Sequence, residues 1–184
     1  RDAPGQGGLD NESTWELRPF PGRRFAAVGA CLCGGESWKW LAQHVLHWLE
    51  EMELDPPAGF DVYRLLNELG LKSAGAPRVT PTFLGERFDP RIRGRIEDLD
   101  MDNFSLAGLA RGLAEGIVKN LADLLPAEFM RDRKRVVGSG NALRRNALLR
   151  KAVEDVMGLP LSLGEEMEEA AVGAALVVAG RHKA

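Results

Sequence analysis

The sequence contains 184 residues, 45% of them hydrophobic and 28% charged, and carries a formal net charge of −3. This size and composition suffice for one sizeable domain with a buried core and argue against disorder over most of the chain. The acidic balance argues against a general nucleic-acid binder, and charges interrupt the long apolar stretches, so no membrane span is expected.

The chain is expected to begin with a loop and a buried strand. Residues 1–22 are interpreted as a lead-in loop, since the first 13 are rich in Gly, Pro and polar side chains. The domain itself is expected over residues 23–184. Its first element is the apolar run over residues 25–32, which predicts a buried strand that ends in a tight turn at Gly34 and Gly35.

The next segment predicts an amphipathic helix that begins at Glu36 or Ser37 and ends near Glu53. Its apolar stripe has nearly helical spacing and consists of Trp38, Leu41, Ala42, Val45, Leu46, Leu49 and Met52. His44 and His47 lie three residues apart on the opposite, polar face. Metal binding by this pair is one interpretation, but a solvated helix face is the simpler one, and we expect no metal site.

The two cysteines are predicted to be free thiols. Cys31 and Cys33 are separated by one residue on an extended segment at the end of the predicted strand, where a disulfide between them is geometrically poor. The pair also lacks the second pair of ligands that a zinc site needs. Free thiols are typical of a reducing compartment, so we expect a cytoplasmic protein.

The middle of the chain predicts two helices separated by an irregular segment. The first covers residues 60–69 and is ended by Gly70, and the region over residues 72–103 contains three prolines. Ser105 is expected to cap a long helix that ends near Leu125. One face of this helix carries a glycine at every fourth position, which allows another backbone to approach closely: Gly108, Gly112 and Gly116.

The last third of the chain alternates strands and helices. A short strand is expected over residues 135–137, a Gly-Ser-Gly-Asn turn over 138–141 and a helix over 142–157. A strand over residues 161–163 and an Ala-rich helix over 165–178 follow. This order predicts an α/β fold with a sheet covered by helices.

The segment VVGSGNALRRN, residues 136–146, is the best local signal for a ligand site. A strand leads into a glycine turn and a helix follows at once, so a flat or charged ligand can approach the backbone there. The segment is neither a GxGxxG motif, because position 143 is Leu, nor a Walker loop, because no GK[ST] follows. Nucleotide binding and an ordinary strand-to-helix turn both remain open on this evidence.

The region from Arg131 to Lys151 is strongly basic, with eight Lys or Arg residues against one Asp. Such a cluster attracts phosphate or nucleic acid. It is also a common feature of a solvated helix face, which we consider the simpler interpretation.

Three stretches, taken in order, resemble the C-terminal half of FGGY carbohydrate kinases. The first is GACLCGG, residues 29–35, with the Trp-rich helix after it. The second is TPTFLGER, residues 80–87, which is similar to the "P-x-x-x-GER-x-P" segment of the family. The third runs from Val136 through DVMGLP, residues 155–160, to AAVGAAL, residues 170–176. Within the family, GSGNAL and TPTFLGER look most like the sedoheptulokinase branch.

The resemblance implies an α/β fold of the actin-like ATPase (ribonuclease H-like) class, in which this chain is the C-terminal lobe. The lobe would have a mixed sheet flanked by helices and would lack its first two strands, which leaves residues 25–32 as an exposed edge. It further implies ATP and Mg²⁺ as cofactors, and transfer of the ATP γ-phosphate to a sugar, here sedoheptulose to give sedoheptulose 7-phosphate.

The resemblance also implies where the nucleotide would bind. Gly138, Ser139, Gly140 and Asn141 would line the adenosine pocket, and Asn146 would lie near the adenine or ribose. Gly35 and Lys39 match a second family position near the nucleotide. Glu86 and Arg87 are expected to form a buried ion pair that supports the cleft.

No catalytic or metal-binding residue is expected in this chain, because the corresponding family motifs lie upstream. The implied partners are a small-molecule sugar, ATP and the missing N-terminal lobe, without nucleic acid or membrane, and the chain alone is expected to be inactive. Two alternatives remain: another FGGY kinase of the xylulose, ribulose or glycerol type, and a non-catalytic sugar-kinase-like binding module.

Overall fold

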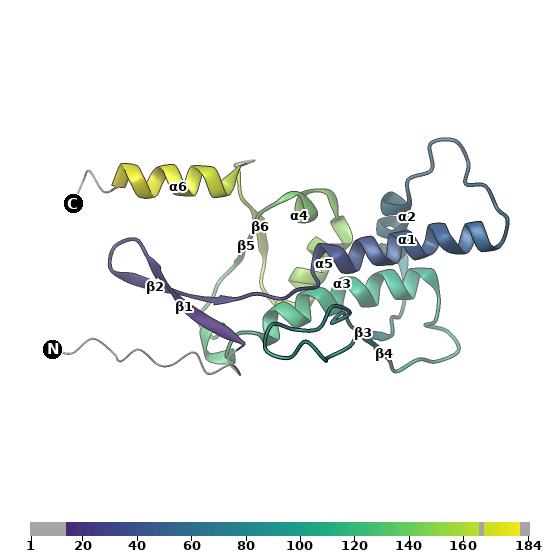
Figure 1. Cartoon of the computed structure of the whole chain (residues 1–184), viewed down its shortest axis with the longest axis horizontal. Helices are drawn as coiled ribbons and strands as arrows, with labels where there is room; N and C mark the ends of the chain where they lie inside the picture. Colours follow the sequence, from purple (N-terminus) through teal and green to yellow (C-terminus); the bar gives the residue numbers. More distant parts are fainter. Residues whose placement is uncertain (1–13, 166–167, 181–184) are drawn as a thin grey trace.

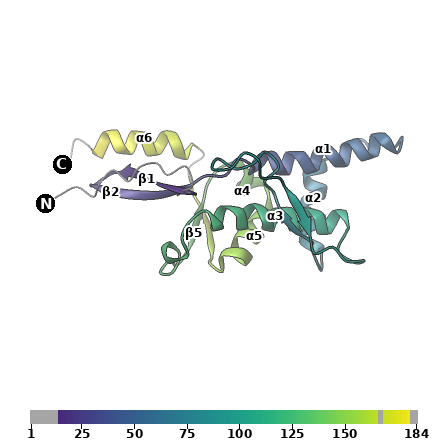
Figure 2. The ribbon, with the colours of Figure 1, turned by 60° about the horizontal axis from the view of Figure 1, so that its bottom comes forward.

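A computed structural model describes residues 14–165 and 168–180 of the chain. Most of the expected lead-in loop and the end of the domain at residue 184 lie outside these residues. A group of packed helices forms one end of the molecule, and a β-hairpin and the last helix extend together from the other end (Figures 1 and 2).

The hairpin consists of β1 (Trp15–Phe20) and β2 (Arg24–Gly29), paired antiparallel with Trp15 opposite Gly29. The prediction of a loop through residue 22 is therefore wrong for β1, and the predicted edge strand has β1 beside it. The chain reverses at Gly22, which has a positive φ of 77° that glycine adopts without strain. The sequence did not predict β1 because apolar and polar residues do not alternate regularly along it. Its side chains are almost all exposed, so no buried face marks the strand.

Four helices form the core: α1 (Gly35–Glu51), α2 (Val62–Lys72), α3 (Leu106–Asp123) and α5 (Ala147–Met157). Helix α3 lies in the middle and packs against both α2 and α5. The core is aliphatic and includes Leu41, Ala42, Val45, Leu66, Leu113, Ile117, Leu148 and Val153. The predicted stripe of α1 is confirmed at its N-terminal half, whereas Leu46 and Met52 are exposed near its end.

Another backbone approaches the glycine face of α3 closely, as the four-residue spacing predicted, and it belongs to a second strand pair. Strands β3 (Arg78–Thr80) and β4 (Arg95–Glu97) pair antiparallel inside the region expected to be irregular. A Cβ placed on Gly112 would lie 2.3 Å from the Pro77 carbonyl oxygen, and one on Gly116 would lie 2.0 Å from that of Val79. Only glycine allows β3 to lie this close to the helix.

Two predicted helix ends are wrong because the residues have packing roles instead. Gly70 lies inside α2, and a Cβ there would come within 2.2 Å of Leu148 Cδ2, so this glycine permits α2 to pack on α5. Ser37 lies inside α1 and is buried, and its hydroxyl donates to the Cys33 carbonyl at 2.5 Å and to the Pro81 carbonyl at 3.3 Å. The N-cap of α1 is Gly34, without a side-chain cap.

The third strand pair is parallel and joins β5 (Val136–Gly138) to β6 (Leu161–Leu163). The helix expected between them is interrupted: α4 (Asn141–Arg145) ends at Asn146, which has an extended backbone and begins α5. Helix α6 (Glu169–Gly180) follows β6, and its expected packing face is exposed throughout: Ala170, Ala171, Ala174 and Ala175. Among the described residues the strands form three two-stranded sheets, two antiparallel and one parallel, flanked by helices, rather than the single mixed sheet that was expected.

The start of α3 provides a direct test of the predicted capping. The Ser105 hydroxyl accepts a hydrogen bond from the backbone N–H of Gly108 at 3.0 Å, as expected of an N-cap. We expect Ser105→Ala to lower the free energy of unfolding by about 1 kcal/mol, since one helix donor loses its acceptor. Urea denaturation would measure this change, with Ser105→Asp as the control that restores the cap; an unchanged midpoint in Ser105→Ala would contradict the assignment.

Candidate functional site

The predicted glycine turn connects β5 to α4 and exposes its backbone. Gly140 has a φ of 86°, and a Cβ placed there would have no heavy atom within 4 Å. Ser139 and Asn141 on either side are exposed. Gly138 differs, since it is buried and a Cβ would lie 2.7 Å from Leu143 Cδ1. The turn therefore combines one glycine that packing requires with another that faces open space.

Asn146 lies at the break between α4 and α5 and is only 7% exposed. Its side-chain Oδ1 accepts a hydrogen bond from the Leu149 backbone N–H at 2.7 Å, which caps α5. The structure thus gives Asn146 a capping role through its oxygen. A contact between this residue and a nucleotide stays a prediction.

The second predicted group lies at the beginning of α1. Gly35 is exposed, and a Cβ there would meet no atom within 4 Å. Lys39 is also exposed and has Glu36 3.7 Å away. In both views the N-terminal end of α1 lies on the same part of the molecule as α4 (Figures 1 and 2), so the two predicted groups occupy neighbouring regions.

Several members of the basic cluster make structural contacts. An Nη2 of Arg144 donates to the Gly164 carbonyl at 2.8 Å and to Glu169 Oε1 at 2.7 Å, which connects α4 to the beginning of α6. The same guanidinium holds the pKa of the Glu169 carboxyl below its ordinary value. Arg150 donates to the carbonyls of Leu143 and Arg144. These bonds stabilise the turn between β5 and α5, so the cluster is not simply a free cationic surface.

In the GER segment, residues 85–87, the buried glutamate has a different partner from the one expected. Glu86 is 3% exposed, but its Oε1 accepts a hydrogen bond from Asn120 Nδ2 at 2.9 Å, and Arg87 is exposed. The prediction of a buried Glu86–Arg87 pair is therefore wrong. Asn120 lies on α3, 34 residues away from Glu86 in the chain. The sequence did not identify it as the partner because a single asparagine in a helix shows no pattern that indicates a buried contact.

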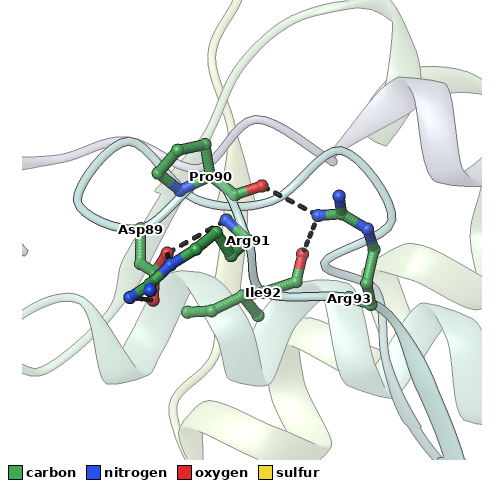
Figure 3. A network of polar contacts seen from close by, with 5 residues as sticks. All are labelled: Asp89, Pro90, Arg91, Ile92 and Arg93. Atoms are coloured by element: carbon green, nitrogen blue, oxygen red, sulfur yellow. Dashed lines mark hydrogen bonds and ion pairs between the residues drawn. The ribbon is translucent and has the colours of Figure 1, made fainter.

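The loop after the GER segment contains two sets of polar contacts beside an open hollow. The side chain of Arg91 pairs with Asp89 at 3.0 Å, which lowers the pKa of that carboxyl, and Nη1 of Arg93 donates to the carbonyls of Pro90 and Ile92 (Figure 3). The hollow has a volume of about 440 Å³ and is lined by residues 88–92. Arg91 is the cation among these lining residues and is already paired with Asp89, so this hollow is not a strong anion site.

The histidines and cysteines form no joint site in the part of the chain that the structure describes. His47 lies near Glu50 and Glu51 on an exposed face, and His44 Nδ1 lies 2.9 Å from the Trp40 carbonyl oxygen. Cys31 and Cys33 are free, as predicted. Across residues 14–165 and 168–180, no three His, Cys, Asp or Glu side chains come together as metal ligands, and no helix is long and apolar enough to cross a membrane.

Comparison with known proteins agrees with the fold. The chain is 32% identical over 166 residues to human sedoheptulokinase and 31% identical over 165 residues to mouse sedoheptulokinase. Each alignment includes 89% of this chain but only 34% of the relative, so the chain spans about a third of the length of these proteins. The crystal structure of xylulose kinase from Rhodospirillum rubrum is similar to this structure, with a TM-score of 0.70 and 26% sequence identity. The superposition covers 90% of this chain and 33% of the xylulose kinase chain.

The fold class expected from the sequence, a lobe of an actin-like ATPase, is confirmed by this structural likeness. The model of the FGGY family of carbohydrate kinases, C-terminal domain, matches residues 17–180. This match includes most of β1 and almost all of the residues that the structure describes. The chain therefore belongs to the FGGY family of carbohydrate kinases, whose C-terminal domain it contains.

Proposed function

We propose that this chain is the ATP-binding lobe of a kinase that phosphorylates sedoheptulose to sedoheptulose 7-phosphate in the cytoplasm. The family match supports a carbohydrate kinase, and the two sedoheptulokinase relatives support this substrate. The likeness to a xylulose kinase keeps another ketose or polyol as the alternative substrate. In this proposal most of the sugar-contacting surface belongs to the part of the relatives that this chain does not span.

The open backbone of Gly140 is the observation that carries the nucleotide assignment. Its positive φ requires glycine, and the space where a Cβ would lie is empty, so a ligand can reach the chain there. In this proposal Gly138, Ser139, Gly140 and Asn141 line the adenosine pocket, and Asn146 lies near the adenine or ribose. A second group, Gly35 and Lys39, approaches the nucleotide from α1.

Phosphoryl transfer requires an in-line acceptor hydroxyl, a residue that orients it, and cations that neutralise the developing charge. In this proposal neither the catalytic base nor a Mg²⁺ ligand lies in this chain, because the family motifs that carry them lie upstream of the part that it resembles. These groups belong, in this proposal, to an N-terminal lobe that closes over the nucleotide and excludes water. The 184 residues alone are therefore expected to be inactive.

A non-catalytic binding module is the second candidate, and the basic residues between Arg131 and Lys151 are the feature that favours it. A salt-sensitive affinity for nucleic acid would support this function. The bonds that occupy Arg144 and Arg150 within the fold weigh against it.

A coupled assay of ADP release tests the function. The protein extended upstream to its initiating methionine, called the extended protein below, is offered sedoheptulose, xylulose, ribulose and glycerol in turn with ATP and Mg²⁺. We expect sedoheptulose to give the highest kcat/KM by at least about tenfold, and the 184-residue chain to release no ADP with any sugar. A higher kcat/KM for another sugar would replace the substrate, and no sugar-dependent release by the extended protein would reject the kinase function.

A further inference from the structure

A ring of hydrogen bonds encloses the glycine turn between β5 and α4. The backbone N–H of Gly164 donates to the Gly138 carbonyl at 2.9 Å, and the backbone N–H of Arg144 donates to the Gly140 carbonyl at 3.3 Å. The Arg144 side chain closes the ring, because its Nη2 donates to the Gly164 carbonyl at 2.8 Å. The turn is therefore tied at both of its glycines to segments that are themselves joined by one guanidinium.

Glu169, the first residue of α6, holds the guanidinium that closes this ring. Arg144 Nη2 also donates to Glu169 Oε1 at 2.7 Å, and a Cβ placed on Gly164 would lie 3.4 Å from the same oxygen. The two side chains are only 20% and 28% exposed, so solvent and salt screen this pair less than a surface pair. The carboxylate therefore fixes the direction in which Arg144 reaches back to Gly164.

The turn needs such support because little packing holds it. A Cβ placed on Gly140 would have no heavy atom within 4 Å, and Ser139 and Asn141 are exposed. A glycine backbone loses more conformational freedom than any other when it is fixed. Hydrogen bonds that fix the turn before a ligand arrives lower the entropic cost of binding there. The affinity of the turn for its ligand is therefore expected to depend on the bonds of Arg144.

We propose that Glu169 is a positioning residue for ATP: through Arg144 it holds the glycine turn in its binding conformation, so the beginning of α6 sets the nucleotide affinity. The inference rests on the proposed function, which places the adenosine at this turn. Glu169 acts through Arg144 and needs no contact with the nucleotide. Its loss should therefore weaken ATP binding and leave sugar binding and the transfer step unchanged.

A second ion pair in the chain provides a matched control. Arg111 donates to Glu115 Oε1 at 2.7 Å and to the Ser73 carbonyl at 2.8 Å. The two side chains of this pair are 31% and 34% exposed. It thus has the same composition as the Arg144 site, an arginine shared between a glutamate and a backbone carbonyl, but it joins α3 to the end of α2. Its variants report the cost of losing such a pair away from the turn.

The inference is tested by titration calorimetry of the extended protein with ATP in the absence of sugar. Glu169→Ala is expected to weaken ATP binding about fivefold, and Arg144→Ala about tenfold, because the second change also removes the bond to Gly164. The double variant should bind no more weakly than Arg144→Ala alone, since Glu169 acts through Arg144. Glu169→Gln keeps an oxygen that can accept from Arg144, so its affinity should lie between those of the unsubstituted protein and Glu169→Ala.

The control variants and steady-state kinetics separate positioning from general stability. Glu115→Ala and Arg111→Ala should lower the Tm by an amount similar to that of their counterparts at positions 169 and 144, and should leave the affinity for ATP within about twofold. Glu169→Ala should raise the KM for ATP, while kcat and the KM for the sugar stay within about twofold. A loss of packing alone would not produce this selective change.

An ATP affinity that falls in Glu169→Ala, stays constant in Glu115→Ala and falls no further in the double variant would support the inference. Unchanged ATP affinity in Glu169→Ala, additive losses in the double variant, equal losses in Glu115→Ala, or loss of folding in Glu169→Ala would overturn it, as would an extended protein that binds no ATP. ADP release separates the two proposals. Affinity that depends on Glu169 without sugar-dependent release supports the positioning role and rejects the kinase function, whereas release with unchanged affinity in Glu169→Ala does the reverse.

Discussion

Gly116→Ala is expected to lower the free energy of unfolding by about 2–3 kcal/mol, or roughly 5–10 °C in Tm, measured by thermal and urea denaturation. The new methyl group would lie 2.0 Å from the Val79 carbonyl oxygen and 3.0 Å from its carbon. Both atoms belong to the backbone of β3, which cannot rotate away as a side chain would. The strand pair must therefore separate from α3, and this cost exceeds the gain of about 1 kcal/mol from the helix propensity of alanine.

Gly173→Ala in α6 is the matched control for that effect. It also replaces a helical glycine, but a Cβ there would have no atom within 4 Å. We expect this change to be neutral or slightly stabilising, by up to about 1 kcal/mol. Equal destabilisation by both substitutions would show that the close approach of β3 to α3 does not determine the effect.

Gly140→Ala is expected to weaken ATP binding by the extended protein at least about tenfold, which corresponds to roughly 1.4 kcal/mol. The methyl group would occupy the open space beside the turn, and the φ of 86° would strain any residue other than glycine. Isothermal titration calorimetry without sugar measures this affinity independently of the phosphoryl transfer step. The strain itself, at a φ of 86° and a ψ of 162°, is expected to lower the stability by about 1–3 kcal/mol.

Gly158→Ala separates the loss of nucleotide affinity from backbone strain. Gly158 ends α5 with a φ of 62° and, like Gly140, has open space where a Cβ would lie. It is not among the predicted nucleotide residues, so its substitution should lower stability by about 1 kcal/mol and leave ATP affinity unchanged. Weaker ATP binding in both variants, or in neither, would contradict the assignment of the glycine turn.

Several parts of this fold could be predicted because their signals are local in the chain. The capping of α3 by Ser105 depends on a hydrogen bond to a residue three positions away. The glycine spacing of α3 follows from helical periodicity, and the strand over residues 161–163 follows from a short apolar run bounded by turn residues. The motifs that resemble the FGGY family also indicated the family that the comparisons show.

Other parts depended on contacts between residues far apart in the chain. Gly70 was expected to end a helix, but it lies inside α2. A glycine is needed there because Leu148 packs against this position. Glu86 was expected to pair with its neighbour Arg87, but its partner is Asn120 on α3. Such contacts leave no periodic pattern around either residue, so local propensity alone cannot reveal them.

The sequence by itself thus determined the family, the order of most helices and the position of the glycine turn, because these depend on motifs and on interactions within one or two helical turns. The tertiary structure alone decided that β1 pairs with β2, that Asn146 divides the helix after the turn, and that Glu86 has an oxygen without a partner. These features arise from packing between distant segments, in which burial and hydrogen-bond satisfaction override local preference.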